Sequence, residues 1–216
     1  MPRVVITGAG TINALGHDVP STLVAMREGV CGIGPLDIRD VDRLQIQIGG
    51  QVRGFEAEGR YNQQMSLYDR FTQFTLAAAR EAIEQSGLTF SGELAAKSGV
   101  VLGTAGGGVS TWDDNYRAVY EDGKNRVHPF VVPKLMNNAA ASHVGMEWNL
   151  KGPSFTVSTA CAASNHAMAQ ASLGDHYACV QADMALAAAA YERALAADPD
   201  LRHQGVVRYY MLTGRR

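Results

Sequence analysis

One segment, residues 151–171, constrains the fold most, because it joins a short apolar strand directly to a helix. Residues 155–157 predict a buried strand, the small residues 158–160 predict a turn, and the following residues predict a helix. Cys161 therefore lies at a strand-to-helix turn. A helix start offers unpaired N–H groups and a partial positive charge, and both favour a thiolate over a thiol. We expect Cys161 to be a nucleophile whose turn also offers backbone N–H groups to an oxyanion.

Cysteine also packs as a small buried hydrophobe, and the pattern alone leaves that alternative open for Cys161. The other cysteines, Cys31 and Cys179, are widely spaced and match neither a disulfide framework nor a CxxC metal site, so we interpret both as ordinary thiols. His166 follows Cys161 by five positions, which turns the two side chains about 140° apart on a helix. We expect His166 to be a polar residue in a partly buried seam rather than a general base.

Composition limits the function classes. The chain has 216 residues, of which 46% are hydrophobic and 19% charged, as in a globular protein of one or two domains. A net charge of -2 without blocks of like charge disfavours nucleic-acid binding. The N-terminus lacks a secretion signal, and no apolar run approaches the roughly 20 residues of a membrane span. We expect a soluble cytoplasmic protein without a membrane partner.

Strand and helix patterns alternate ahead of the cysteine segment. Two glycine-rich turns, at 8–10 and 103–108, match neither the dinucleotide fingerprint nor a Walker loop, so we interpret the first as a tight turn and the second as close backbone packing. The patterns predict strands at 4–7, 44–52 and 98–102, and helices at 19–28, 66–86 and 112–120.

Several motifs together resemble one enzyme family. STACAASNHA at 158–167 is similar to the active-site turn of the β-ketoacyl-acyl carrier protein synthases, which are condensing enzymes of the thiolase-like superfamily, here of the KAS I/II type. VVITGAGTINALG at 4–16, YDRFTQFTLAAAREAIEQSGL at 68–88 and KGP at 151–153 resemble the same family. The resemblance covers about residues 3–172, and it implies a further helix at 138–145.

The resemblance implies an α/β fold, the N-terminal half of a layered αβαβα architecture in which a mixed sheet carries helices on both faces. It implies acyl transfer to Cys161 and then decarboxylative Claisen condensation with a malonyl thioester, in fatty-acid or polyketide synthesis. The implied partners are an acyl carrier protein and a second chain, as homodimer or heteromer, with no cofactor and no metal. By position, Phe130, Val131 and Pro133 are candidates for lining the acyl channel or the dimer seam.

The resemblance stops after Ser172, which divides the chain into a family-like domain at 1–172 and an alanine-rich tail at 173–216, with a helix expected at 181–197. In the family a second half supplies two histidines and a lysine for decarboxylation, and the tail has no counterpart of them. We expect a truncated, catalytically incomplete acyltransferase.

A shifted reading frame, an erroneous gene end and a fusion would each explain why the resemblance stops after Ser172. The alternatives are a non-catalytic fragment or subunit that needs a partner chain, and simpler thioester chemistry at the cysteine.

Overall fold

The computed structural model describes residues 5–56 and 67–180. The chain forms two units, Ile6–Met168 and a second made of Met1–Val5 with Ala169–Arg216. Helix α7 (Ala163–Val180) begins in the first unit and ends in the second. The helix expected at 181–197 lies outside the described residues.

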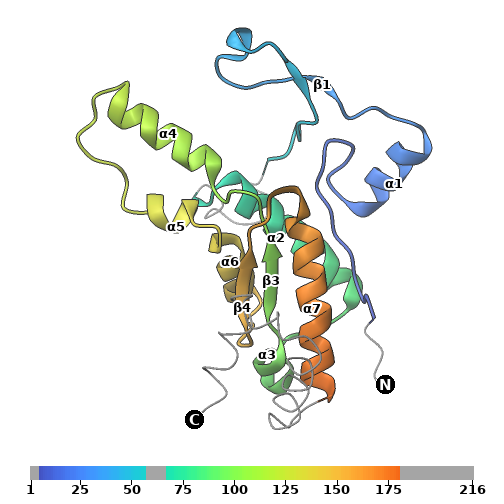
Figure 1. Ribbon diagram of the computed structural model, residues 1–216. Helices are drawn as coiled ribbons and strands as arrows, with labels where there is room; N and C mark the ends of the chain where they lie inside the picture. Colours follow the sequence, from blue (N-terminus) through green and yellow to red (C-terminus); the bar gives the residue numbers. More distant parts are fainter. Residues whose placement is uncertain (1–4, 57–66, 181–216) are drawn as a thin grey trace, which may run out of the picture. The chain divides into compact units, whose positions relative to one another are not determined.

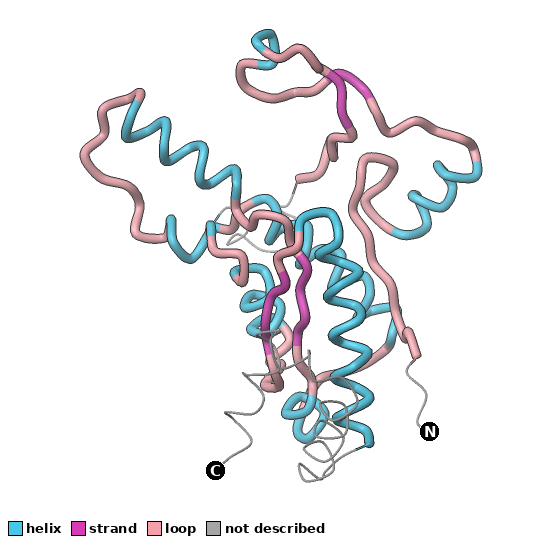
Figure 2. Tube along the Cα trace, in the orientation of Figure 1, coloured by secondary structure: helices cyan, strands magenta, loops and turns pink. Residues whose placement is uncertain are grey.

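Two parallel strands are the centre of the first unit. Strand β3 (Val100–Gly103) pairs with β4 (Ser154–Val157), and Val100 lies opposite Ser154. Figure 2 shows the pair in magenta, running side by side. Both strands were predicted from their apolar runs, to within two residues. Parallel strands require a long crossover connection. Because β3 and β4 run in the same direction, the turn after β4 that carries Cys161 begins at the same end of the sheet as the loop after β3.

The crossover from β3 to β4 contains three helices (Figure 1): α4 (Val109–Tyr120), α5 (Val131–Leu135) and α6 (Ala139–Glu147). Helix α6 contacts both strands, while α4 contacts α5. The sequence predicted α4 and α6 but not the five-residue helix α5, which is too short to show periodicity.

The longest helix wholly within this unit is α2 (Arg70–Ser86), which packs against α6. Its N-cap is Asp69, whose side chain accepts a hydrogen bond from the Phe71 N–H at 3.2 Å. Gly87 ends the helix with φ 66°, a left-handed conformation that glycine adopts without strain. The helix predicted at 66–86 is therefore confirmed with the same last residue. It begins at Arg70 rather than at residue 66, because Asp69 is its N-cap.

Helix contacts bury the core. The alanines of α6 at 139–141 are almost completely buried, and these small side chains allow α2 and the strands to approach closely. The larger members of the core cluster come from α2, α6 and the loop before α2: Phe55, Leu76, Ala77 and Val144. The core therefore assembles around the α2–α6 contact.

The N-terminal segment differs from the prediction of a strand at 4–7, because the described residues 5–7 form no strand. Instead, the segment runs against α2 with its backbone in contact. A Cβ added at Gly8 would lie 1.9 Å from the Ala82 carbonyl oxygen, and one at Gly10 would lie 1.9 Å from that of Ala78. These glycines serve close packing on a helix rather than a tight turn alone.

Side chains of α2 take the place of a neighbouring strand for this segment. The Ala9 N–H donates to Gln85 Oε1 at 2.6 Å, and the Thr11 N–H donates to Glu81 Oε2 at 2.9 Å. Glu81 Oε1 also accepts from the Val19 N–H at 2.7 Å. One carboxylate therefore satisfies backbone donors on both sides of the first loop.

Helix α1 (Val19–Arg27) follows that loop, as predicted for 19–28. Asp18 caps it by accepting from the Ser21 N–H at 2.7 Å, and Gly29, with φ 69°, lies just beyond its end.

The next segment forms little regular structure. Strand β1 (Gly34–Pro35) pairs antiparallel with β2 (Ile48–Gly49), and the 3-10 helix η1 (Val41–Arg43) lies between them. Of the strand predicted at 44–52, only Ile48–Gly49 is formed, and one further bond beyond the pair runs from the Leu36 N–H to the Gln47 carbonyl at 2.8 Å. A short helix that the sequence analysis did not predict, α3 (Gly92–Lys97), precedes β3.

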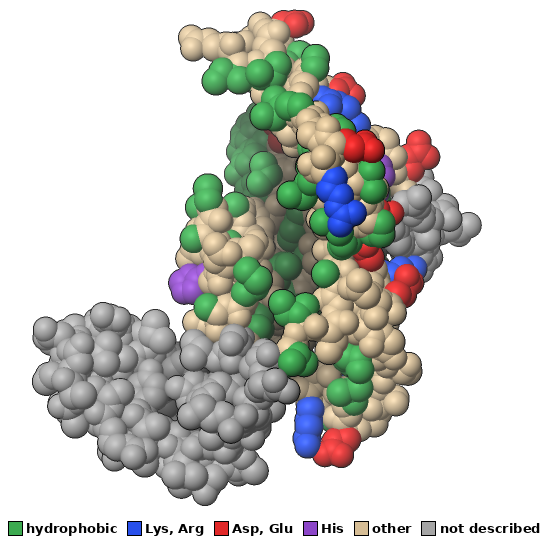
Figure 3. Space-filling model, turned by 90° about the vertical axis from the view of Figure 1, so that its right-hand side faces the viewer, with side chains coloured by type: hydrophobic (Ala, Val, Ile, Leu, Met, Phe, Trp, Pro, Cys, Tyr) green, Lys and Arg blue, Asp and Glu red, His purple; other side chains and the backbone are tan. Residues whose placement is uncertain are grey.

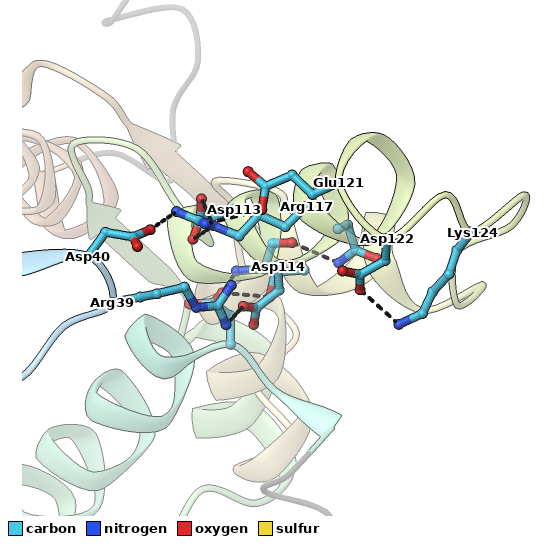
Figure 4. A network of polar contacts seen from close by, with 11 residues as sticks. Arg39, Asp40, Asp113, Asp114, Arg117, Glu121, Asp122 and Lys124 are labelled. Carbon is cyan, nitrogen blue, oxygen red and sulfur yellow. Dashed lines mark hydrogen bonds and ion pairs between the residues drawn. The ribbon is translucent and has the colours of Figure 1, made fainter.

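Ion pairs connect this segment to α4 (Figure 4). Arg117 lies 3.1 Å from both Asp40 and Asp113, and Arg39 pairs with Asp114 at 3.7 Å. The hydrogen bond to Asp113 raises the pKa of Arg117. Exposed pairs of this kind each stabilise by about 0–1 kcal/mol, so the network orients the loop more than it stabilises the fold.

Within the described residues, none of the helices combines the length and the apolar character that crossing a membrane requires.

Candidate active site

Cys161 lies in the turn between β4 and α7, within the 3-10 helix η3 (Ala160–Ala162). Its side chain is exposed and carries a free thiol. The first hydrogen bond of the turn runs from the Ala162 N–H to the Thr159 carbonyl at 3.0 Å. The alternative of a buried, packing cysteine is excluded, and the strand-to-helix placement of Cys161 is confirmed.

Two features of the backbone, the conformation of Ala160 and the close packing of Gly103, determine where Cys161 lies. Ala160 has φ 47°, in the left-handed region that costs a non-glycine residue about 1–2 kcal/mol. Behind the turn, Gly103 at the end of β3 meets the start of α7: an added Cβ would lie 2.3 Å from the Ala163 carbonyl oxygen. The glycine at 103 therefore lets α7 begin directly against the sheet, which fixes the position of Cys161.

The glycine-rich loop at 103–108 packs closely, as predicted. The Thr104 N–H donates to the Val157 carbonyl at 3.1 Å, and the Ser158 hydroxyl donates to the Ala105 carbonyl at 3.3 Å. These bonds join the loop to the turn that carries Cys161.

A cavity of about 230 Å³ lies beside α4 and α5 in the same unit. Its apolar wall consists of Leu67, Phe130 and Val131. Two of the three predicted channel residues therefore line one cavity, whereas the third, Pro133, is exposed and does not belong to its wall. Cys161 is not part of the wall either.

Polar residues complete the wall: Thr111, Asn115, His128 and Lys134. Three of these four side chains, those of Thr111, Asn115 and His128, hydrogen-bond within the protein. The Asn115 amide donates to the Thr111 carbonyl at 2.7 Å, and His128 Nδ1 accepts from the Phe130 N–H at 3.1 Å. The wall therefore presents mainly apolar surface to a ligand.

The sequence analysis missed the partner of Thr111. Asp69, only 4% exposed, accepts from the Thr111 N–H at 2.8 Å and from the Thr111 hydroxyl at 2.6 Å. An N-cap signal was readable at Asp69, since Asp commonly precedes a helix. No local pattern could reveal a partner 42 positions away.

Two histidines, His166 and His143, differ in burial. His166 is exposed within the described residues, and its place in a partly buried seam stays a prediction. His143 is half-buried, its ring centroid 4.1 Å from that of Tyr68, and burial lowers its pKa. Across residues 5–56 and 67–171, no three or more His, Cys, Asp or Glu side chains gather as a metal site would need.

Comparison with known proteins identifies relatives of the whole unit. Residues 1–196 match the family model of the β-ketoacyl synthase N-terminal domain, beyond the boundary expected at Ser172. Nodulation protein E of Rhizobium sp. (strain N33) is 39% identical over 185 residues, which are 86% of this chain and 46% of that protein. The 3-oxoacyl-[acyl-carrier-protein] synthase 2 of Staphylococcus aureus (strain N315) is 32% identical over 170 residues, or 78% of this chain and 41% of that protein.

The fold agrees with these relatives. A β-ketoacyl synthase from Burkholderia phymatum STM815 superposes with a TM-score of 0.66 at 23% identity, covering 82% of this chain and 44% of that one. The predicted α/β, thiolase-like fold is therefore confirmed, and this chain spans less than half the length of the relatives it matches. The chain belongs to the β-ketoacyl synthase family and carries its N-terminal domain.

Proposed function

We propose that this chain supplies the acyl-accepting cysteine of a β-ketoacyl synthase. The observation that carries the proposal is the exposed Cys161 thiol at a strand-to-helix turn, where Gly103 packs against the start of α7. Cys31 is also exposed, but it lies in a loop with no helix start beside it.

The proposed step is transthioesterification. The Cys161 thiolate attacks the carbonyl carbon of an acyl thioester and forms a new C–S bond. The oxyanion of the tetrahedral intermediate accepts a hydrogen bond from the Cys161 N–H. The donor C–S bond then breaks, and the donor leaves as a thiol with the proton that Cys161 released.

The cavity beside α4 and α5 is the site that we propose for an acyl segment. At about 230 Å³ it lies below the roughly 300–1,000 Å³ of drug-sized pockets, so it suits a short stretch of chain. Phe130 and Val131 supply apolar contact, and the exposed Pro133 remains assigned to the channel mouth or subunit seam.

We propose an acyl carrier protein as the thioester donor, because a relative that is 32% identical is a 3-oxoacyl-[acyl-carrier-protein] synthase. A cytoplasmic location suits a cysteine that must stay reduced. By resemblance, condensation with a malonyl thioester uses the two histidines and the lysine of a second half, and this chain spans less than half the length of the relatives it matches. Losing one oxyanion donor alone typically costs about 100- to 1,000-fold in rate. We therefore expect loading of Cys161 without condensation.

A second candidate function is that of a subunit that works with a partner chain, either a second copy or a related polypeptide. Large apolar side chains are exposed on this unit, among them Ile6 at 89% and Met168 at 62%. Figure 3 shows such side chains in green on one face. Exposed apolar side chains of this kind favour association.

Acyl transfer to the full chain tests the proposal. After incubation with a decanoyl thioester of an acyl carrier protein, peptide mass spectrometry should find the decanoyl group on Cys161. Cys161→Ala should abolish the adduct, whereas Cys31→Ala, the matched control, should retain it. Absence of an adduct, or equal acylation of Cys31 and Cys161, would contradict the proposal.

A further inference from the structure

The buried carboxylate of Asp69 does more than cap α2. Its Oδ1 accepts from the Phe71 N–H at 3.2 Å, as an N-cap does. Its Oδ2 accepts from both the N–H and the hydroxyl of Thr111, at 2.8 and 2.6 Å. Asp69 thus joins the start of α2 to the first turn of α4.

The residue that Asp69 holds belongs to the cavity wall. Thr111 is 6% exposed, and its hydroxyl is committed to Asp69 rather than to the cavity. A hydroxyl and a methyl share one Cβ, so fixing the hydroxyl also fixes where the methyl lies. Without Asp69, that hydroxyl would be an unpaired polar group at an apolar wall.

The packing around Asp69 leaves no room for rearrangement. A Cβ added at Gly108 would lie 3.0 Å from Asp69 Oδ2 and 2.7 Å from the Leu135 Cα, at the end of α5. Asp69 therefore lies where the start of α4 and the end of α5 converge, and these two helices border the cavity.

We propose that Asp69 is a positioning residue that keeps the cavity selective for apolar chains by engaging the hydroxyl of Thr111. The inference rests on the proposed use of this cavity for an acyl segment. A purely structural role for Asp69 would instead affect folding alone and would not depend on the Thr111 hydroxyl.

Binding of dansyl-labelled undecanoate to the full chain, followed by fluorescence, tests the inference. Asp69→Ala should weaken binding about tenfold, the effect of one unpaired hydroxyl at the wall. Thr111→Val, which replaces the hydroxyl by a methyl of similar shape, removes the group that Asp69 engages and sets the reference affinity for the comparison. The double variant should regain affinity to within about twofold of Thr111→Val. Asp113→Ala, an exposed carboxylate on the same helix, is the matched control and should bind normally.

Rescue by Thr111→Val separates the two explanations, because a merely structural loss would persist in the double variant. If Asp69→Ala does not fold, Asp69→Asn replaces it, with a smaller loss that Thr111→Val should again reverse. Wild-type affinity in the Asp69 variants, failure of rescue, or no probe binding by the wild type would each overturn the inference. Acyl loading of Cys161 is measured separately, so failure here leaves the proposed function testable on its own.

Discussion

Two exposed thiols in one unit show how backbone context distinguishes residues of the same type. Cys161 lies in η3 at the start of a helix, after a residue with φ 47°. Cys31 lies in a loop, where its Sγ is 3.8 Å from the Ile33 carbonyl oxygen. Exposure does not separate them, so any difference in reactivity comes from the N–H groups and helix dipole around the sulfur.

His143 makes the stability of the fold depend on pH. Burial against Tyr68 lowers its pKa, so the folded protein binds this proton less readily than the unfolded chain does. Stability should therefore be full above the ordinary histidine value of about 6.5 and should fall as pH drops below it, towards the folded pKa.

Urea denaturation of the wild type and of His143→Gln, at about pH 7.5 and about pH 5.5, measures this effect. The wild type should lose more stability between the two values than the variant does. An identical loss in both proteins would show that His143 does not contribute.

At the scale of elements, the contact between the N-terminal segment and α2 depends on glycine. Gly10→Ala would place a Cβ 1.9 Å from the Ala78 carbonyl oxygen, and separating the backbones should cost about 2–3 kcal/mol of unfolding free energy. Gly50→Ala is the matched control: its Cβ would meet only the Ala14 Cβ, at 3.7 Å, and should change stability by less than about 0.5 kcal/mol. Equal denaturation midpoints for the two variants would contradict this account.

Elements with strong local signals could be predicted from the sequence, and those that depend on distant partners could not. Helix α2 and strands β3 and β4 were predicted because periodicity, an apolar run and a terminal glycine act within a few residues. Residues 5–7 have the composition of a strand but form none, and the glycines that follow them, Gly8 and Gly10, contact the backbone of α2 rather than another strand. Strand pairing depends on tertiary contacts, which cannot be predicted from local composition.

The candidate site divides in the same way. Cys161 was predicted because its turn is encoded by consecutive residues. The bond between Asp69 and Thr111 was not, since it depends on how α2 and α4 pack. Pro133 was assigned by position in the family, and position alone does not decide whether a side chain reaches the cavity wall.

For the whole molecule, the exposed apolar side chains of the first unit, such as Ile6 and Met168, bear on association. Ile6 is 89% exposed, so Ile6→Ser should change unfolding free energy by less than about 0.5 kcal/mol while reducing self-association. Sedimentation velocity over a range of concentrations measures the association. Ile12→Ser is the control, because Ile12 packs against the core cluster and should lose about 2 kcal/mol or more. If Ile6→Ser destabilises as strongly, or associates as the wild type does, the exposed surface does not drive association.

The central claim is that the strand-to-helix turn prepares one sulfur for acyl transfer, and the rate of iodoacetamide labelling near neutral pH tests it most directly. Labelling of the full chain, quenched at intervals and quantified by peptide mass spectrometry, gives a rate for each cysteine. The account predicts that Cys161 is labelled at least about tenfold faster than Cys31, although both are exposed. Equal rates at the two sulfurs would contradict it.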